Sequence, residues 1–369
     1  MEVTQHPEPD RIPYSDFTPE LLQVNDLTSE ELDQFPESIR TFYNYLTGSI
    51  EIDQNNQLDL LTTDRIDVVS KDHSTVLILE RDNNRLLEYD LSDESYTVLA
   101  SQGRGPGDIL FAQELTFHDG KAYVAMQGFQ ISVFDCRQVI CEYEKTIPTK
   151  HNNYSVSSNG EVLFYLGLAP FGGDNPHTSA NQNLIYKIDM DGNVQNSFMP
   201  VYNFKAPVVR DALSSGGKVR SLPDLGKTIV TIDHYPYLFI YDEEQELIEK
   251  YELPELIQPL YEYEERNDSG EWTSGEVYKS NSKISELTVL DQKWLFMRIK
   301  EERGVEFISL VDGFDGCEWH SYYLFDVEAS KLYKVGDDVE FPIYQGRNIH
   351  VTKSGVVLNV KGSLTLIKI

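Results

Sequence analysis

Arginine, histidine and aspartate side chains recur in the segments between apolar runs of this chain, where polar groups are free to meet a ligand. The residues that we expect to take part in binding are Arg81, Arg104, Asp174, His177, His234 and Arg347. Arginines bind carboxylate and phosphate groups, whereas histidines together with carboxylates are also metal ligands. The set therefore predicts either a site for an anionic or polar ligand or a metal centre.

The pattern of the histidines bears on that choice. Zinc accepts three imidazole ligands, but the histidines of this chain follow their apolar runs at different offsets and share no repeated register. Calcium prefers carboxylate and amide oxygens, which Asn152, Asn153 and Asp233 offer. We interpret the histidines as solvated or packed loop residues. We expect no resident cofactor, and calcium is kept as the alternative.

Catalytic signatures do not occur in the sequence, which has no P-loop, no H-E-x-x-H, no Rossmann fingerprint and no Ser-His-Asp signature. The glycine-rich GRGPGD at 103–108 lacks the Lys-Ser/Thr of a phosphate cradle, and Pro106 removes one N–H donor. We interpret it as a sharp turn whose glycines permit positive φ. A binding protein is therefore favoured over an enzyme.

Composition excludes several classes of protein. The 369 residues carry 31 Lys and Arg against 61 Asp and Glu, a net charge of −30 with a pI near 4.5, so nucleic acid and anionic membranes are poor partners. A hydrophobic fraction of 40% is enough for a large core. The sequence contains no run of 18 apolar residues, so it predicts no transmembrane segment. No signal peptide is visible at the start.

Three cysteines are too few for a disulfide framework. Cys136 and Cys141 are close enough in sequence to face each other across a tight hairpin. We favour the other interpretation, in which they are small buried hydrophobic residues. We predict that the protein needs no disulfide to fold.

The chain before residue 58 differs from the rest. Residues 1–27 are polar, acidic and rich in proline, which predicts an irregular arm. Residues 28–57 begin with a capping box at Thr28 and Glu31 and continue with apolar residues at helical spacing. We therefore expect a short helical segment that packs on the main domain.

From about residue 58 the apolar period changes to two, and turn residues follow every 8 to 12 positions, which indicates an all-β protein. An apolar strand that ends in aspartate recurs at Asp90, Asp135, Asp189, Asp242 and Asp326. Each carboxylate can accept N–H groups of the turn that it opens, so we interpret the five aspartates as structural.

Each repeat contains four strands in roughly 50 residues, which describes a blade of a β-propeller. The interval of 84 residues before Asp326 exceeds the others, and we assign an insertion at about 255–283. The last unit has only three strands, and QLDLLT just before the first unit can supply the fourth. The sequence thus predicts one six-bladed domain over 58–369, closed by an N-terminal strand that leaves no free sheet edge.

The repeat resembles six-bladed β-propellers of the NHL/TolB-like kind, and it is most similar to exported bacterial members. In that family the first complete blade is typically followed by a Gly-x-Gly-Pro-Gly-acidic turn, which here is GRGPGD at 103–108 between the strands YTVLA and ELTFH. The resemblance implies a periplasmic or cell-surface protein, lipid-anchored through a segment not present in this chain. It leaves the activity unassigned.

Function on such a scaffold is expected at one face. The loops that join each unit to the next, and the second strand to the third, lie together there and carry the six candidate residues. We take strand residues to be committed to packing between sheets, so only loop side chains are expected to converge on a ligand. We expect a monomeric, non-enzymatic protein that binds a ligand, protein, peptide or carbohydrate, and a metal-dependent lactonase-like hydrolase or lyase is the alternative.

Overall fold

The structure is a computed structural model, and the residues that it describes make an almost entirely β-stranded molecule. They are 17–47, 57–58, 65–72, 74–93, 95–127, 129–150, 152–168, 183–200, 216–233, 237–253, 260–266, 272–278, 282–291, 293–303, 317–342, 347–352, 355–360 and 363–368. Within them there is a single α-helix, so the predicted all-β class is confirmed. None of the described helices is long and apolar enough to cross a membrane.

The described strands form seven sheets, six of which have four or five strands. The first three sheets comprise β4 (Ile66–Ser70), β5 (Thr75–Glu80), β6 (Arg85–Asp90) and β7 (Ser95–Ala100); β8 (Ala112–His118), β9 (Lys121–Met126), β10 (Gln130–Asp135) and β11 (Glu142–Pro148); and β12 (Asn152–Ser158), β13 (Val162–Leu168), β14 (Asn183–Asp189) and β15 (Val194–Pro200). In each of them, consecutive strands pair as antiparallel neighbours, as expected for a meander.

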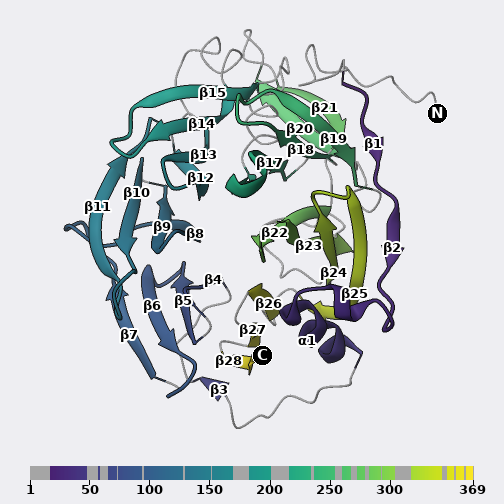
Figure 1. Ribbon diagram of the computed structural model, residues 1–369. Helices are drawn as coiled ribbons and strands as arrows, with labels where there is room; N and C mark the ends of the chain where they lie inside the picture. Colours follow the sequence, from purple (N-terminus) through teal and green to yellow (C-terminus); the bar gives the residue numbers. More distant parts are fainter. Residues whose placement is uncertain are drawn as a thin grey trace.

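The next three sheets continue the same order. They comprise β16 (Gly217–Leu222), β17 (Lys227–Ile232), β18 (Tyr237–Tyr241) and β19 (Leu247–Glu252); β22 (Ser282–Val289), β23 (Trp294–Arg303), β24 (Cys317–Asp326) and β25 (Lys331–Pro342); and β26 (Arg347–Thr352), β27 (Gly355–Val360), β28 (Ser363–Lys368) and β3 (Gln57–Leu58). The sheets stand around a central axis, with their first strands toward the centre (Figure 1). This arrangement is a β-propeller.

Hydrophobic clusters hold neighbouring sheets together. In β5, Leu77 and Leu79 pack with residues of the second sheet, while Val76 and Ile78 belong to a cluster that includes Val357 of β27. Alternate residues of one strand thus serve two interfaces, and β5 is buried along its whole length because both of its faces are covered. The cluster with Val357 joins the last sheet to the first.

The two ends of the chain meet in one sheet. β3 pairs antiparallel with β28, with Leu58 opposite Leu364 and Gln57 opposite Thr365. A strand from the N-terminal side therefore completes the sheet formed by the three C-terminal strands, as the incomplete last repeat had suggested.

Residues 20–26 follow the outside of the molecule (Figure 1). β1 (Glu20–Leu21) and β2 (Val24–Asp26) add as parallel edge strands to β19 and β25, where the sequence had predicted only an irregular arm. The 3₁₀ turn η1 (Leu32–Gln34) and helix α1 (Glu37–Leu46) come next. The apolar stripe of α1 buries Phe42, whose ring centroid lies 4.8 Å from that of Tyr322 and 5.7 Å from that of Phe296.

The expected insertion at 255–283 contains a hairpin. β20 (Leu260–Arg266) and β21 (Trp272–Tyr278) pair antiparallel as a separate two-stranded sheet between the fourth and fifth sheets in chain order.

The turn role of the five repeated aspartates is confirmed. Each carboxylate accepts a backbone N–H from two to four residues further on, namely those of Ser92, Arg137, Asp191, Glu246 and Glu328. These bonds favour the ionised form, and the N–H of Ser92 is the main cause of the lowered pKa of Asp90. Local chemistry therefore fixes these turns in successive sheets.

The interpretation of Cys136 and Cys141 needs correction. Both are buried, but they form a disulfide across the turn between β10 and β11, with their Cα atoms 4.0 Å apart. The turn brings the two strands close enough for a bond that the spacing alone had left as an alternative. The bond closes the loop that exposes Val139 and Ile140.

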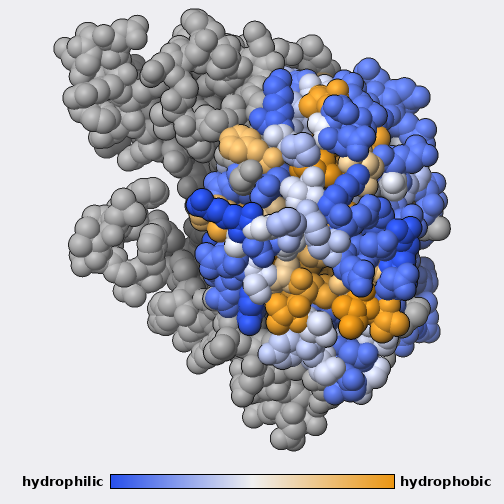
Figure 2. All heavy atoms as spheres, turned by 90° about the vertical axis from the view of Figure 1, so that its left-hand side faces the viewer, coloured by the Kyte–Doolittle hydropathy of each residue, from blue (hydrophilic) through white to orange (hydrophobic). Residues whose placement is uncertain are grey.

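The outer side that carries β7 and β11 is mainly hydrophilic, with a group of hydrophobic residues in its lower half (Figure 2). Exposed apolar side chains of this region include Val98 on β7 and Val139 in the disulfide loop, and Val139 is 90% exposed. The hydrophilic remainder agrees with the charge of −30.

Candidate functional site

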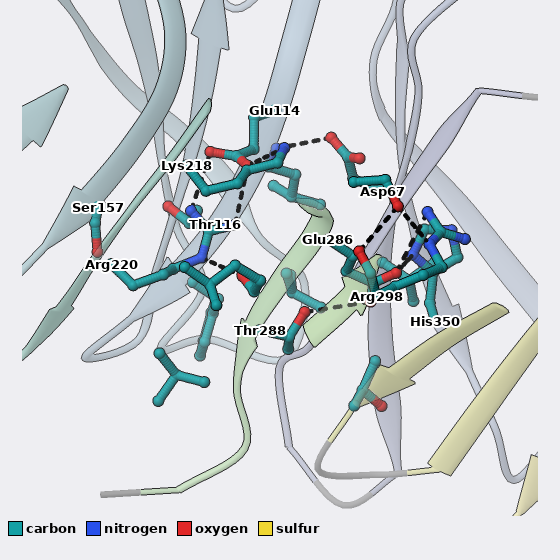
Figure 3. A pocket seen from close by; sticks show the side chains of 18 of the residues that line it. Asp67, Glu114, Thr116, Ser157, Lys218, Arg220, Glu286, Thr288, Arg298 and His350 are labelled. Atoms are coloured by element: carbon teal, nitrogen blue, oxygen red, sulfur yellow. Dashed lines mark hydrogen bonds and ion pairs between the residues drawn. The ribbon is translucent and has the colours of Figure 1, made fainter. Parts of the chain in front are cut away.

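A pocket of about 840 Å³ lies on the axis of the propeller. The first strand of every four- or five-stranded sheet lines it, through Asp67, Glu114, Ser157, Arg220, Glu286 and His350 among others (Figure 3). Its volume is in the range of small-molecule sites, about 300–1,000 Å³. The lining is rich in charge, which is unusual for residues that sit on otherwise apolar strands.

Three β-bulges lie in the inner strands around this pocket, and two of them place a glutamate, Glu114 or Glu286, on its lining. The register between first and second strands shifts between Ala112 and Glu114, between Asn153 and Ser155, and between Ile284 and Glu286. In all three sheets the residue directly after the bulge is a buried Glu or Ser. A bulge bends its strand and re-aims the side chains that follow. The same device therefore recurs in three inner strands, close to their starts.

Glu114 is the centre of the first polar cluster. Its Oε1 lies 2.6 Å from Nζ of Lys218 and 2.9 Å from Nη2 of Arg220, and its Oε2 accepts a hydrogen bond from the N–H of Val156 at 3.1 Å. Burial raises the pKa of Glu114, but the charges of Arg220 and Lys218 outweigh burial and lower it from 4.5 to about 2. The carboxylate is thus ionised and fully partnered.

This cluster also joins the sheets around the axis. Arg220 of β16 donates from Nε to the carbonyl oxygen of Leu287 in β22 at 2.6 Å, besides its pair with Glu114 of β8. Asp67 of β4 accepts the N–H of Leu115 in β8 at 3.2 Å. Near the axis, where side chains border a polar pocket, ion pairs and hydrogen bonds take over the role that apolar packing has further out.

Glu286 is the centre of the second cluster. Its Oε2 lies 3.4 Å from Nδ1 of His350 and 3.5 Å from Nη2 of Arg298, and its Oε1 accepts a hydrogen bond from Thr288 at 3.2 Å. Burial raises the pKa of Glu286, but the charges of His350 and Arg298 outweigh it, so the net direction is downward. One partner of Glu286 has an unsatisfied polar atom, because Nε2 of His350 has no hydrogen-bond partner among the described residues.

Charge is unevenly distributed along the pocket. Its described lining has seven Lys and Arg and seven Asp and Glu, so it is neutral in a chain of net charge −30. We call the end where the inner strands begin the cationic end; its charged residues are Arg65, Arg81, Lys218, Arg220, Arg298 and Lys300, against Asp67, Glu114, Asp233 and Glu286. The opposite end has Lys71 against Asp72, Asp224 and Asp291.

Of the six predicted residues, two have side chains that the structure describes, and one of these, Arg81, lies at the pocket. Arg81, in the turn after β5, lines the cationic end and donates from Nη1 to the carbonyl oxygen of Gln113 at 2.6 Å. Arg104 is exposed in the loop between β7 and β8 and does not line the pocket. Arg347 is the first residue of β26, and its side chain lies outside the described residues.

Asp174, His177 and His234 also lie outside the described residues. For the alternative of a metal centre, no cluster of three or more His, Cys, Asp or Glu side chains suited to a metal ion occurs within the described part of the chain. Of the calcium candidates, Asn153 is buried and donates from Nδ2 to the carbonyl oxygen of Gln130 at 3.0 Å.

The expectation that strand residues are committed to packing between sheets is wrong. Most charged groups at the cationic end belong to strands, among them Glu114, Lys218, Arg220, Glu286 and Arg298. The first strand of each sheet is an edge that faces the axis, so its side chains are not confined to packing between sheets. A signal for them exists in the sequence, because an ionised residue inside an apolar strand has to be paired.

Comparison with known proteins supports the fold alone. No family model and no curated protein matches the chain. A member of the DUF4221 family from Bacteroides vulgatus superposes with a TM-score of 0.51 at 8% identity, covering 86% of this chain and 94% of that one. A Bacteroides fragilis protein expected to be exported gives 0.49 at 11% identity, with coverages of 88% and 80%. A streptogramin B lyase gives 0.46 at 12% identity, with coverages of 85% and 96%.

Proposed function

We propose that this chain is an exported, monomeric, six-bladed β-propeller that binds a small anionic ligand in the central pocket without changing it chemically. The ligand's carboxylate lies at the cationic end. The six sheets of four or five strands support the blade number, and the disulfide between Cys136 and Cys141 supports export, because such bonds persist in oxidising compartments.

The observation that carries this proposal is the charge pattern of the pocket. Cations outnumber carboxylates at one end, although Asp and Glu outnumber Lys and Arg about two to one in the whole chain. Local field, rather than net charge, governs capture of a charged ligand in a cleft. The strongly acidic remainder repels anions from other surfaces and leaves this end as the favoured place for one.

Arg81 is the cation best placed to meet the ligand. It lines the pocket, its Nη1 donates to the carbonyl oxygen of Gln113, and its buried Nε has no hydrogen-bond partner among the described residues. A guanidinium can bind a carboxylate through two parallel N–H groups. We therefore expect it to share its remaining donors with the ligand.

The test is calorimetry and thermal shift with citrate and galacturonate, using galactose as the neutral counterpart of galacturonate. The acids should raise the melting temperature, because a ligand that binds only the folded state stabilises it, and galactose should not. Arg81→Met should weaken binding of the acids about 10-fold, equivalent to about 1.4 kcal/mol.

Arg137→Met is the control, because Arg137 is an exposed cation that pairs with Asp135 outside this pocket. It should leave affinity within about 2-fold. Added EDTA or calcium should change nothing. If no acid binds at millimolar concentration, or galactose binds as well as galacturonate, the proposal fails.

A further inference from the structure

His350 is a buried histidine in β26 that is 4% exposed and lines the central pocket. Its Nδ1 faces Oε2 of Glu286 at 3.4 Å, and Arg298 holds the same carboxylate. This contact leaves Nε2 as the ring nitrogen that Glu286 does not face.

Nε2 is buried and has no hydrogen-bond partner among the described residues. Buried polar atoms are nearly always hydrogen-bonded, and an unmet one costs about 1–3 kcal/mol. Since Glu286 faces the ring from its other side and is itself paired with Arg298, the ring cannot easily turn Nε2 toward another protein group.

A second orphan atom lines the same pocket. Oγ1 of Thr116 in β8 is buried without a hydrogen-bond partner among the described residues. Thr116 and His350 both appear with the polar groups of the pocket (Figure 3). An imidazole nitrogen accepts a hydrogen bond through a lone pair or donates one through N–H, and the threonine hydroxyl can do either. A ligand with hydroxyl groups can satisfy both.

We infer that the ligand is a hydroxylated carboxylic acid, one of whose hydroxyl groups hydrogen-bonds with Nε2 of His350 while a second meets Thr116. The inference rests on the proposed function for the carboxylate and adds the hydroxyl groups. Glu286 acts as a positioning residue, because it faces the imidazole from the Nδ1 side.

Matched pairs of acids test it by calorimetry: malate against succinate, and gluconate against hexanoate. Each pair differs in hydroxyl groups but keeps the carboxylates. The hydroxylated member should bind the wild-type protein at least about 10-fold tighter, since a site built for a hydroxyl rejects the analogue that lacks it. His350→Leu should reduce that ratio to less than about 3-fold.

Thr116→Val should weaken the binding of gluconate and leave the affinity for hexanoate unchanged. This second variant keeps the test informative if His350→Leu does not fold. Thr231→Val is its matched control, because the hydroxyl of Thr231 is equally buried and unpartnered among the described residues but does not line the pocket. In ¹⁵N NMR of the wild-type protein, the Nε2 resonance of His350 should move with malate and stay with succinate.

Equal affinities within both pairs would overturn this inference and leave the proposed function intact. A panel in which no acid binds would overturn both.

Discussion

Replacement of Glu114 by glutamine should destabilise the protein in a way that depends on pH. The pKa of this carboxyl falls from 4.5 to about 2 in the folded protein, and each pH unit corresponds to about 1.36 kcal/mol. The ionised carboxylate thus contributes on the order of 3 kcal/mol to the free energy of unfolding at neutral pH. Glu114→Gln should remove most of it, because Lys218 and Arg220 stay behind without their anion.

The sign of the pH effect follows from the lowered pKa. Stability from Glu114 is fully present above about pH 4.5 and is lost as the pH falls toward 2, where the folded protein takes up the proton too. The difference between wild type and Glu114→Gln should therefore be about 3 kcal/mol at pH 7 and less than about 1 kcal/mol at pH 2.5. Other carboxyls titrate in both proteins, so they cancel in this difference.

Urea unfolding at pH 7, 5, 3.5 and 2.5, followed by tryptophan fluorescence, measures the difference in the free energy of unfolding between wild type and Glu114→Gln. Glu144→Gln is the control, because Glu144 forms a more exposed pair with Lys121, and it should cost no more than about 1 kcal/mol. Glu114→Gln combined with Lys218→Met should recover part of the loss, since one unpaired cation is then removed. A difference between wild type and Glu114→Gln that stays constant from pH 7 to 2.5 would refute the reasoning.

Three further outcomes are expected. Replacing Cys136 and Cys141 by serine should cost about 2 kcal/mol, because the disulfide closes a short loop, and the protein should still unfold cooperatively in calorimetry. Phe42→Ala should cost about 3–5 kcal/mol in urea unfolding, since the side chain is fully buried between α1 and the propeller. Deletion of 363–369 should abolish soluble expression, because β28 is the strand that joins β27 to β3, and a soluble, cooperatively melting product would contradict the closure.

The repeat could be predicted because its rules are local. A strand that ends in aspartate and the turn that its carboxylate caps are neighbours in the chain, so one sequence shows both. The edge strands β1 and β2 could not be predicted in the same way. Each has two or three residues, pairs with a strand more than 200 residues away and has no pattern of its own.

The ion pairs of the pocket were missed for a related reason. Glu114 and Arg220 are 106 residues apart and meet only when the ring has closed. The bulge before Glu114 also breaks the alternation by which a strand residue is assigned to one face or the other. What the sequence does show is a charged residue inside each strand, Glu114 in AQELTFH and Arg220 in GKVRSL.

The face predicted for binding nevertheless coincides with the cationic end, and the connectivity explains why. In each unit the chain leaves a loop at that face and enters its first strand along the axis, so the start of the strand lies beside the loop. Arg81 in a loop and Lys218 near the start of β16 reach the same end of the pocket from different elements. The loop face on which the sequence predicted binding thus borders the cationic end of the pocket, where strands supply most of the charged side chains.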